Sequence, residues 1–516
     1  MFVLLGILTT SVIGVISYYY WHMTYWKRRN IPEVEEGKSF FTGHFYQYFS
    51  EHPFSMKLPD YTKKYGKTYG IYQGLYKFLV TSDLSIINEV FVRQFDKFHS
   101  RASDPITGNP DTEQMTQLFL SRGARWKRLR ALASPAFTSA NLKKIHNIIE
   151  DSALEMMRFL EDVADKEIDI RQYYTEYTMD IISRVAMGQT KSMMFKNPYQ
   201  GMARKLINFD FSSTLSMLAY CSFIPSIFLR IVFFASIFIP DSSVSVFLKM
   251  LNIIDKAINE RVKQREEDKK RGIEKEDPAD FIDMFLDARV DEIPDETGEF
   301  SRSNTTVSKT LSPVEVKMQL FLFLLAGFDT TANTMGYVTY VLAKNPDKMK
   351  KLQEEIDQEC VDSTIQFDTL GKLKYLDAVL KETLRIYPLA AGVNARLCMK
   401  STTVGDLRIE EGECVMADTW SLHFDKDIWG EDVNEFVPER WLKGVPHPTG
   451  AYLPFGAGPR ICIGMRLAYV EIKTALCYIL RKYDIVEGPN TGEKLDLHGA
   501  LISQPRNINV ILKTRN

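Results

Sequence analysis

A short glycine-rich loop near the end of the chain carries the residue best suited to chemistry, Cys462. The loop reads FGAGPRICIG over residues 455–464, and a helix is expected to begin near Gly464. A cysteine at a helix N-terminus faces backbone N–H groups and the positive end of the helix dipole, which favour the thiolate. The glycines let the backbone approach a flat partner, Phe455 can shield the sulfur from water, and Arg460 can reach a carboxylate on that partner. These features predict a metal-bound thiolate beneath a planar cofactor.

Other metal-binding patterns are absent from the sequence. The six cysteines are irregularly spaced and form no CxxC pair, and the eight histidines show no HExxH or other paired spacing. This spacing argues against a zinc site and against a disulfide framework. We therefore expect a reducing, cytosol-facing environment and a metal that arrives within its own cofactor.

The loop 455–464 matches the signature FxxGxRxCxG at all five specified positions. This is the haem-binding signature of the cytochrome P-450 family, which the chain resembles. The resemblance implies haem b, iron protoporphyrin IX, as the cofactor, with Cys462 as the metal ligand and Phe455, Arg460 and Gly464 as cofactor-binding residues. An inert cysteine in a glycine-rich turn is the alternative.

A polar segment, AGFDTT at 326–331, lies midway along an apolar helix expected from about Pro313 to Ala343. Glycine destabilises a helix, and a threonine hydroxyl can compete for a backbone carbonyl that normally accepts a helical hydrogen bond. A segment that is unfavourable for the helix in this way predicts a functional site. The segment resembles the oxygen-binding groove of the family, which implies catalytic roles for Thr330, as a hydrogen-bond partner of dioxygen, and for Asp329, as a proton relay. An acid that caps a helix break is the alternative.

Glu382 and Arg385 share one face of a predicted helix, about 80 residues before the cysteine. The segment Phe436 to Trp441 lies between them and the cysteine and resembles the PERF-type segment of the family, with Trp441 in place of Phe. The resemblance implies that Arg440 joins Glu382 and Arg385 in a structural network that holds the cysteine loop.

Three further residues are candidates for contact with the carboxylates of the cofactor. Trp126 and Arg130 form a WxxxR pattern that resembles a haem-propionate contact of the family. Arg396, at the end of a strand-like segment from Leu389, is a further propionate candidate. The alternative for the WxxxR pair is a tryptophan of the hydrophobic core next to a surface arginine, neither of which contacts a cofactor.

The elements expected to position these residues are mostly helices. Apolar residues recur at intervals of three and four residues, as in helices, over 141–165, 246–266, 313–344, 346–358, 374–386 and 464–483. Strand-like segments are short and lie at 68–72, 78–81, 403–404, 415–418 and 509–512. The sequence predicts a mostly α fold with small peripheral β-sheets.

The N-terminus predicts a membrane anchor. Phe2 to Trp21 contains no charged residue and is long enough, as a helix, to span a bilayer core. Lys27, Arg28 and Arg29 follow, so the positive-inside rule places the rest of the chain in the cytosol. We expect an anchor at 1–25 and a catalytic domain at 26–516. A cleaved signal peptide is the alternative.

A second apolar stretch, 217–240, contains Pro225, Arg230 and Pro240. These residues argue against a second span, and two amphipathic helices on the membrane surface are expected instead. A buried core helix is the alternative.

Composition excludes several functional classes. The chain has 516 residues with 64 Lys and Arg against 66 Asp and Glu, a net charge of −2, and no basic block. A nucleic-acid binder and a disordered chain are therefore not expected. The length suits one large enzyme domain.

The resemblance implies a haem-thiolate monooxygenase of the animal microsomal type, in the endoplasmic-reticulum membrane, that inserts one atom of dioxygen into a lipophilic xenobiotic, steroid or fatty acid. The chain lacks a GxGxxG signature, so electrons are expected from the NADPH-cytochrome P-450 reductase, with cytochrome b5 as an accessory donor. Candidates for docking that partner are Lys127, Arg128 and Lys443. A haem-thiolate isomerase or dehydratase and a noncatalytic haem-binding protein are the alternatives.

Overall fold

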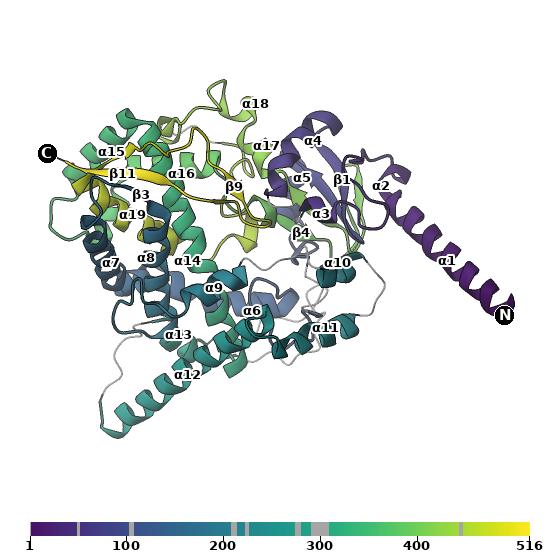
Figure 1. Cartoon of the computed structure of the whole chain (residues 1–516), viewed down its shortest axis with the longest axis horizontal. Helices are drawn as coiled ribbons and strands as arrows, with labels where there is room; N and C mark the ends of the chain where they lie inside the picture. Colours follow the sequence, from purple (N-terminus) through teal and green to yellow (C-terminus); the bar gives the residue numbers. More distant parts are fainter. Residues whose placement is uncertain are drawn as a thin grey trace.

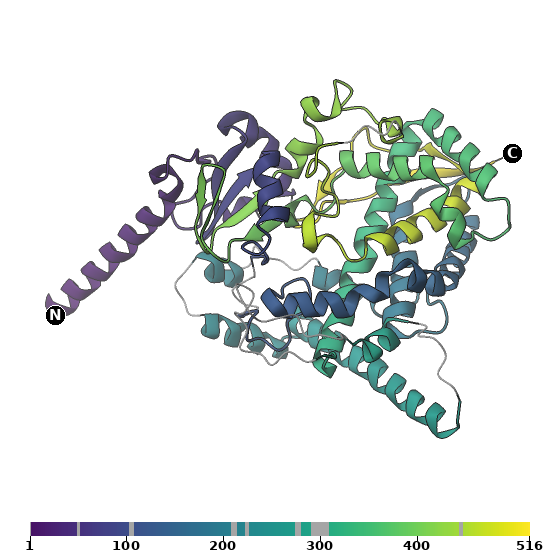
Figure 2. The same ribbon diagram turned by 180° about the vertical axis from the view of Figure 1, so that it is seen from behind.

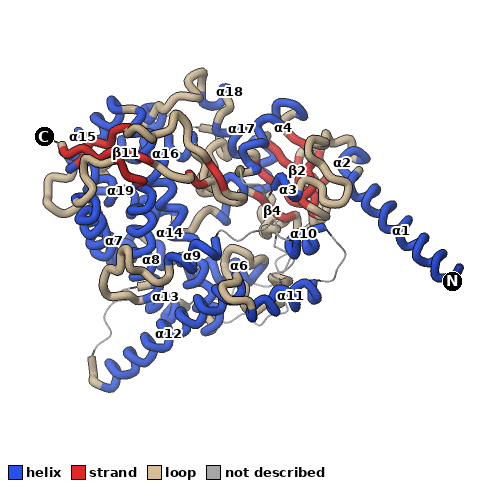
Figure 3. The backbone as a smooth tube through the Cα atoms, in the orientation of Figure 1, coloured by secondary structure: helices blue, strands red, loops and turns tan. Residues whose placement is uncertain are grey.

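The computed structural model describes residues 2–48, 52–102, 108–207, 214–221, 226–273, 280–289, 309–442 and 447–515. Helices dominate one part of the molecule, and most of the larger sheet lies in the other part, next to the N-terminal helix (Figures 1 and 3). The predicted class, mostly α with small separate sheets, is confirmed.

Long helices build the part that positions the candidate site. The longest, α14 (Pro313–Lys344), packs against α8 (Ile170–Met187), α16 (Lys374–Ile386) and α19 (Met465–Lys482). Because α14 is surrounded on several sides, its apolar residues are buried over most of its length. Apart from the N-terminal helix α1 (Phe2–Met23), the other described helices of eight or more residues are α4 (Leu58–Tyr65), α6 (Gly123–Ala133), α7 (Ser139–Glu161), α9 (Gln200–Ile207), α10 (Thr214–Cys221), α11 (Ser226–Ala235), α12 (Ser243–Lys270) and α15 (Pro346–Glu359).

Short helices connect these elements. The short α-helices are α2 (Tyr25–Arg28), α3 (Phe45–Tyr48), α5 (Leu84–Asn88), α13 (Phe281–Asp287), α17 (Thr419–His423) and α18 (Lys426–Trp429). The 3₁₀- and π-helical turns are η1 (Phe54–Lys57), η2 (Glu89–Arg93), η4 (Ser134–Phe137), η5 (Ser236–Phe238), η6 (Phe367–Gly371), η7 (Ala391–Val393), η8 (Pro438–Trp441) and η9 (Gly458–Arg460).

The described strands form four small sheets. The largest has the order β1 (Thr68–Gln73), β2 (Tyr76–Thr81), β7 (Cys414–Ala417), β4 (Ala395–Leu397); β2 and β7 run parallel, and the other pairs are antiparallel. A second sheet has the order β3 (Glu167–Asp169), β11 (Asn509–Thr514), β8 (Tyr483–Glu487). The remaining pairs are β5 (Thr402–Val404) with β6 (Leu407–Ile409), and β9 (Leu497–His498) with β10 (Gln504–Pro505).

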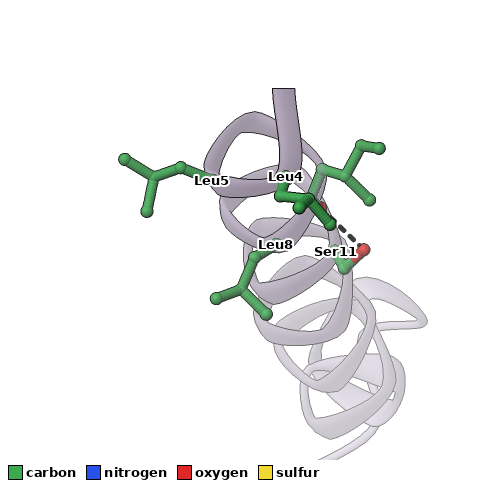
Figure 4. A pocket seen from close by; sticks show the side chains of 5 residues that line it. Leu4, Leu5, Leu8 and Ser11 are labelled. Atoms are coloured by element: carbon green, nitrogen blue, oxygen red, sulfur yellow. Dashed lines mark hydrogen bonds between the residues drawn. The ribbon is translucent and has the colours of Figure 1, made fainter. Parts of the chain in front are cut away.

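The N-terminal helix α1 (Phe2–Met23) projects away from the rest of the molecule, as the views from the front and from behind both show (Figures 1 and 2). Among the described residues it is the one single helix that is long and apolar enough to cross a membrane. Figure 4 shows Leu4, Leu5, Leu8 and Ser11 on its exposed surface, where the Ser11 hydroxyl donates to the Ile7 carbonyl at 2.9 Å. The last turn of α1 differs, because Tyr19 and Met23 are buried together with Trp26 of α2.

The second apolar stretch forms α10, α11 and η5, except for 222–225, which lie outside the described residues. Several large apolar side chains of α11 and η5 are exposed: Ile227, Phe228, Ile231, Val232, Phe234, Ile237 and Phe238. The chain then bends by 74° between Ile227–Phe238 and α12. The alternative of a buried core helix does not fit α11 and η5, because most of their large apolar side chains face solvent.

Candidate active site

The cysteine loop has the predicted local structure. Cys462 lies between η9 and α19, and its backbone N–H donates to the carbonyl of Phe455 at 2.9 Å, which closes the loop. Gly464 is the residue before the first turn of α19. The Phe455 ring packs on Tyr469 of α19, at 5.7 Å between ring centroids.

The sulfur of Cys462 faces the groups that a thiolate requires. Burial raises the pKa of the Cys462 thiol, while the backbone N–H groups of Gly464 and Met465 and the guanidinium groups of Arg130 and Arg101 lower it. Protein atoms surround the Cys462 sulfur on enough sides to desolvate it. The Cys462 side chain nevertheless keeps a large accessible surface. An exposed sulfur inside the body of the protein indicates an internal opening, which a cofactor can fill.

One glycine of the loop, Gly458, is required by a contact within the protein and not by close approach to a flat partner. Gly458 has a φ of +68°, and a Cβ there would lie 1.9 Å from the carbonyl oxygen of Phe91. The close approach at this position is therefore to the backbone of η2, and only glycine avoids both the clash and the left-handed strain.

Four arginines from separate elements are close enough to influence one another or the Cys462 sulfur. Arg101 follows the π-helical turn η2, Arg130 lies on α6, Arg396 on β4 and Arg460 on η9. Burial lowers the pKa of all four, to about 10 for Arg101, and the neighbouring guanidinium groups lower that of Arg460 further. Among the described residues, none of the four pairs with a carboxylate. Such an excess of buried positive charge calls for an anionic partner.

The donors of this cluster test whether haem b fits the site. Among the described residues, the buried Nε atoms of Arg101 and Arg396 have no hydrogen-bond partner, although the same guanidinium groups donate through other nitrogens to the carbonyls of Val393 at 2.6 Å and Ala457 at 3.2 Å. Arg460 instead donates to the carbonyls of His99 at 2.7 Å, of Phe119 at 3.1 Å and of Ser121. Unpartnered cationic donors beside a cysteine suit a macrocycle that carries propionate groups, so the residues fit haem. Arg101 was missed in the sequence, where an isolated arginine in a loop carries no motif.

Trp126 packs into the same region. Its buried ring lies under the guanidinium carbon of Arg460, at 4.7 Å from the ring centroid, and beside Phe95 at 5.1 Å. The WxxxR pattern thus places Trp126 against one arginine of the cluster and contributes another, Arg130, one turn later.

The polar segment of α14 lies in an unbroken helix. Thr330 donates its hydroxyl to the Ala326 carbonyl at 2.6 Å, as expected for a threonine that diverts a helix carbonyl. Ala326 is exposed and Gly327 and Thr330 are half-buried, while Phe328 and Asp329 are buried. One face of α14 therefore borders open space at Ala326 and Thr330. The alternative, an acid that caps a helix break, is wrong because the helix continues to Lys344.

Asp329 points to partners other than Thr330. Its carboxylate accepts a hydrogen bond from Asn333 at 3.1 Å and lies 3.6 Å from Arg171 of α8. Burial raises its pKa, and Arg171 and Asn333 oppose that shift. Arg171 was also missed, because its link to α14 depends on helix packing and leaves no trace in sequence spacing.

The predicted network around Glu382 is present. Glu382 accepts from Arg385 at 2.8 and 3.0 Å, from Arg440 at 3.0 Å and from the backbone of Val437 at 3.1 Å. The indole N–H of Trp441 donates to the same carboxylate at 2.9 Å, so the substitution of Trp for Phe adds a donor. Glu382 and Arg385 are fully buried. Their opposite charges and their hydrogen bonds offset the free-energy cost of removing both groups from water.

The candidate docking residues have different surroundings. Lys127 is exposed on α6. Arg128 is buried and pairs with Glu315 of α14, so its assignment as a docking residue is wrong. Lys443 lies outside the described residues.

Comparison with known proteins agrees with this geometry. The family model described as Cytochrome P450 matches residues 32–512. The chain belongs to the cytochrome P450 family. Among its relatives from Caenorhabditis elegans, "Putative cytochrome P450 CYP13A3" is 46% identical over 515 residues, which cover 98% of this chain and 97% of the relative. The similarly named CYP13A1 is 42% identical over 514 residues (98% and 98%), and CYP13A10 is 43% identical over 524 residues (100% and 100%).

Membership of the cytochrome P450 family confirms the resemblance found in the sequence and gives the site its chemical class. It supports a haem-thiolate monooxygenase and implies a haem-iron cofactor, dioxygen, an organic substrate and a redox partner. In this cytochrome P450, the cysteine loop, the arginine cluster and the polar segment of α14 are the residues that the structure offers for those roles.

Proposed function

We propose that this chain is a membrane-bound monooxygenase that inserts one atom of dioxygen into a lipophilic organic molecule, with haem b held by Cys462. The observation that carries the proposal is the exposed cysteine at the N-terminus of α19, beside four arginines that lack a carboxylate. Cys462 is the metal ligand, Phe455 and Gly464 belong to the loop that presents it, and Trp126 with the four arginines holds the propionates.

The residues of the chain have separate tasks. When bound, the haem supplies the redox chemistry that activates oxygen, for which a thiolate ligand is suited. The N–H groups of Gly464 and Met465 stabilise the negative charge on the sulfur. Thr330 presents a hydroxyl at the open face of α14, and Asp329 can hold a proton, because burial raises its pKa.

The membrane association of the chain is supported by two surfaces. The hydroxyls of Thr9, Thr10 and Ser11 in α1 all donate to the carbonyl four residues earlier, so these three side chains bring no unsatisfied donor into hydrocarbon. The exposed apolar side chains of α11 and η5 offer a second, shallow contact. Together they support a single-pass membrane protein. The endoplasmic reticulum is proposed from the family resemblance, and a catalytic domain that faces the cytosol is proposed because Lys27, Arg28 and Arg29 follow the helix.

The substrate and the electron source follow from the same surroundings. Lipophilic molecules partition into the membrane that α1 and α11 would contact, so a xenobiotic, steroid or fatty acid suits this location. Electrons would come from the NADPH-dependent reductase, with cytochrome b5 as an accessory donor, and exposed Lys127 is the remaining described candidate for docking.

The experiment uses the full chain in lipid with the reductase, NADPH and isotopically labelled dioxygen. The expected result is one labelled oxygen atom in a product of a lipophilic compound, formed only when NADPH is present. Turnover without NADPH or dioxygen would instead identify an isomerase or dehydratase, and a screen in which no compound is converted or shifts the haem spectrum would favour a haem-binding protein.

A further inference from the structure

The peptide of Leu453 is held from both sides at the point where the cysteine loop begins. Its N–H donates to Nε2 of His423 at 3.0 Å, and its carbonyl accepts from the side-chain amide of Asn394 at 3.0 Å. Leu453, His423 and Asn394 are all buried, so water does not compete for these bonds. Two residues later Phe455 begins the closed turn that ends at Cys462.

The charged network around Glu382 does not reach this loop by itself. Arg385 donates to the carbonyls of His423, Val433 and Glu435, and Arg440 donates to backbone carbonyls in the same region. Within the described part of the chain, neither arginine nor Glu382 forms a hydrogen bond with residues 453–464. Any hydrogen-bonded connection between the network and the cysteine loop therefore runs through another residue.

His423, at the end of α17, has the geometry of that connection. Its backbone carbonyl accepts from the Arg385 guanidinium at 2.9 Å, and its Nδ1 lies 3.0 Å from the Arg385 carbonyl. The ring also stacks on Tyr452, at 5.5 Å between centroids and 22° between planes. Tyr452 in turn donates to the Lys381 carbonyl at 3.1 Å, so the stacked His423 and Tyr452 rings are also connected to α16 by a hydrogen bond.

The two ring nitrogens of His423 have fixed roles. The Leu453 N–H is a donor, so Nε2 must accept and carry no proton. Nδ1 then carries the proton and donates to the Arg385 carbonyl. Burial lowers the pKa of His423 to about 3, which keeps the ring in this neutral form at ordinary pH.

We propose that His423 is a positioning residue that transmits the Glu382–Arg385–Arg440 network to the loop carrying Cys462. The inference rests on the proposed role of Cys462 as haem ligand and names the route by which a distant ion-pair network fixes that ligand. A neutral imidazole suits the task because it satisfies one donor and one acceptor that lie on opposite sides of it.

The test compares two amide substitutions with a control elsewhere in the protein. The Gln amide of His423→Gln reaches the place of Nε2 and can accept from Leu453, whereas the shorter amide of His423→Asn reaches only the place of Nδ1. His146→Asn is the matched control, because buried His146 on α7 also bonds a loop backbone through Nε2, at 2.6 Å from the Ile365 carbonyl. The readouts are the spectrum of the reduced, carbon-monoxide-bound holoprotein and amide hydrogen exchange at Leu453.

The expected result is that His423→Asn loses the red-shifted Soret band of thiolate ligation and exchanges the Leu453 amide on the order of tenfold faster. His423→Gln and His146→Asn should retain both properties. An unchanged band and unchanged exchange in His423→Asn, or equal loss in the Asn and Gln variants, would overturn the inference. A wild-type protein without the band would instead refute the proposed function, and exchange at Leu453 would still test the connection.

Discussion

Replacement of Glu382 by Gln tests the network that supports the cysteine loop. The Glu382 carboxylate receives five hydrogen bonds, from Arg385 twice, Arg440, Trp441 and the Val437 backbone. Glutamine has almost the same shape, but it removes the negative charge and turns an N–H₂ group toward two guanidinium groups. Among the described residues, buried Arg385 then lacks a counter-charge, while half-buried Arg440 keeps only Asp432, at 3.2 Å.

The magnitude follows from burial. Breaking one side of a buried ion pair costs ~3 to 5 kcal/mol, which is a large share of the ~5 to 15 kcal/mol that stabilises a typical domain. Trp441→Phe removes only one of the five donors and should lower the free energy of unfolding by ~1.5 kcal/mol while the charges stay paired. Glu354→Gln on α15 makes the same chemical change at an exposed glutamate and should have no measurable effect.

The assay measures the haem-to-protein ratio after purification and the midpoint of thermal unfolding. Glu382→Gln should retain little haem and unfold at a clearly lower temperature, Trp441→Phe should retain haem with a small decrease, and Glu354→Gln should match the wild type. Normal haem content and stability in Glu382→Gln would refute the assignment of this network as the support of the loop.

Three further predictions test other parts of the site. Thr330→Val should yield less product per NADPH consumed, measured with the reductase, while Thr334→Val, which removes the same type of helix bond one turn later, should not. Gly458→Ala should lose haem by absorbance because its Cβ meets backbone at 1.9 Å, whereas Gly405→Ala, with φ +57° and open space, should bind haem normally. Burial raises the pKa of Glu471 from 4.5 to about 8, so its stabilising contribution is complete below pH 4.5 and is lost as the pH rises toward 8. The wild type should therefore lose more thermal stability over this range than Glu471→Gln; equal losses would contradict the burial of a neutral carboxyl.

Apolar residues that recur every three and four positions predict three helices closely, although the helices differ in burial: α15 has one buried face, whereas α14 is buried over most of its length. The expected ranges 313–344, 346–358 and 374–386 match α14, α15 and α16 at both ends within a residue. In contrast, α8 was missed, although it packs closely on α14. From Tyr174 to Met187 every residue of α8 is buried, so polar and apolar residues do not alternate with the helix repeat.

The candidate site was predictable where a motif fixes the spacing and not where packing brings residues together. Cys462 and Glu382 belong to local patterns: Cys462 lies just before α19, and Glu382 pairs with Arg385 at 2.8 Å. Arg101 and Arg171 reach the site across different elements, and His423 connects two segments whose proximity depends on the whole fold. No local spacing could reveal these contacts, because they depend on tertiary structure.

The position of Arg460 shows the same limit. The sequence indicates a guanidinium group directed toward a carboxylate of the cofactor. In the structure three backbone carbonyls of the segment 99–121 accept its hydrogen bonds, so Arg460 also ties that segment to the cysteine loop. Carbonyl acceptors are present in every residue and therefore cannot be recognised from residue types.

The absorption spectrum of the reduced protein with carbon monoxide tests the central claim most directly. Thiolate ligation by Cys462 predicts a strongly red-shifted Soret band in the wild type and its replacement by an unshifted band in Cys462→His. A wild-type spectrum typical of histidine-ligated haem, or a red-shifted band that persists in Cys462→His, would contradict the account.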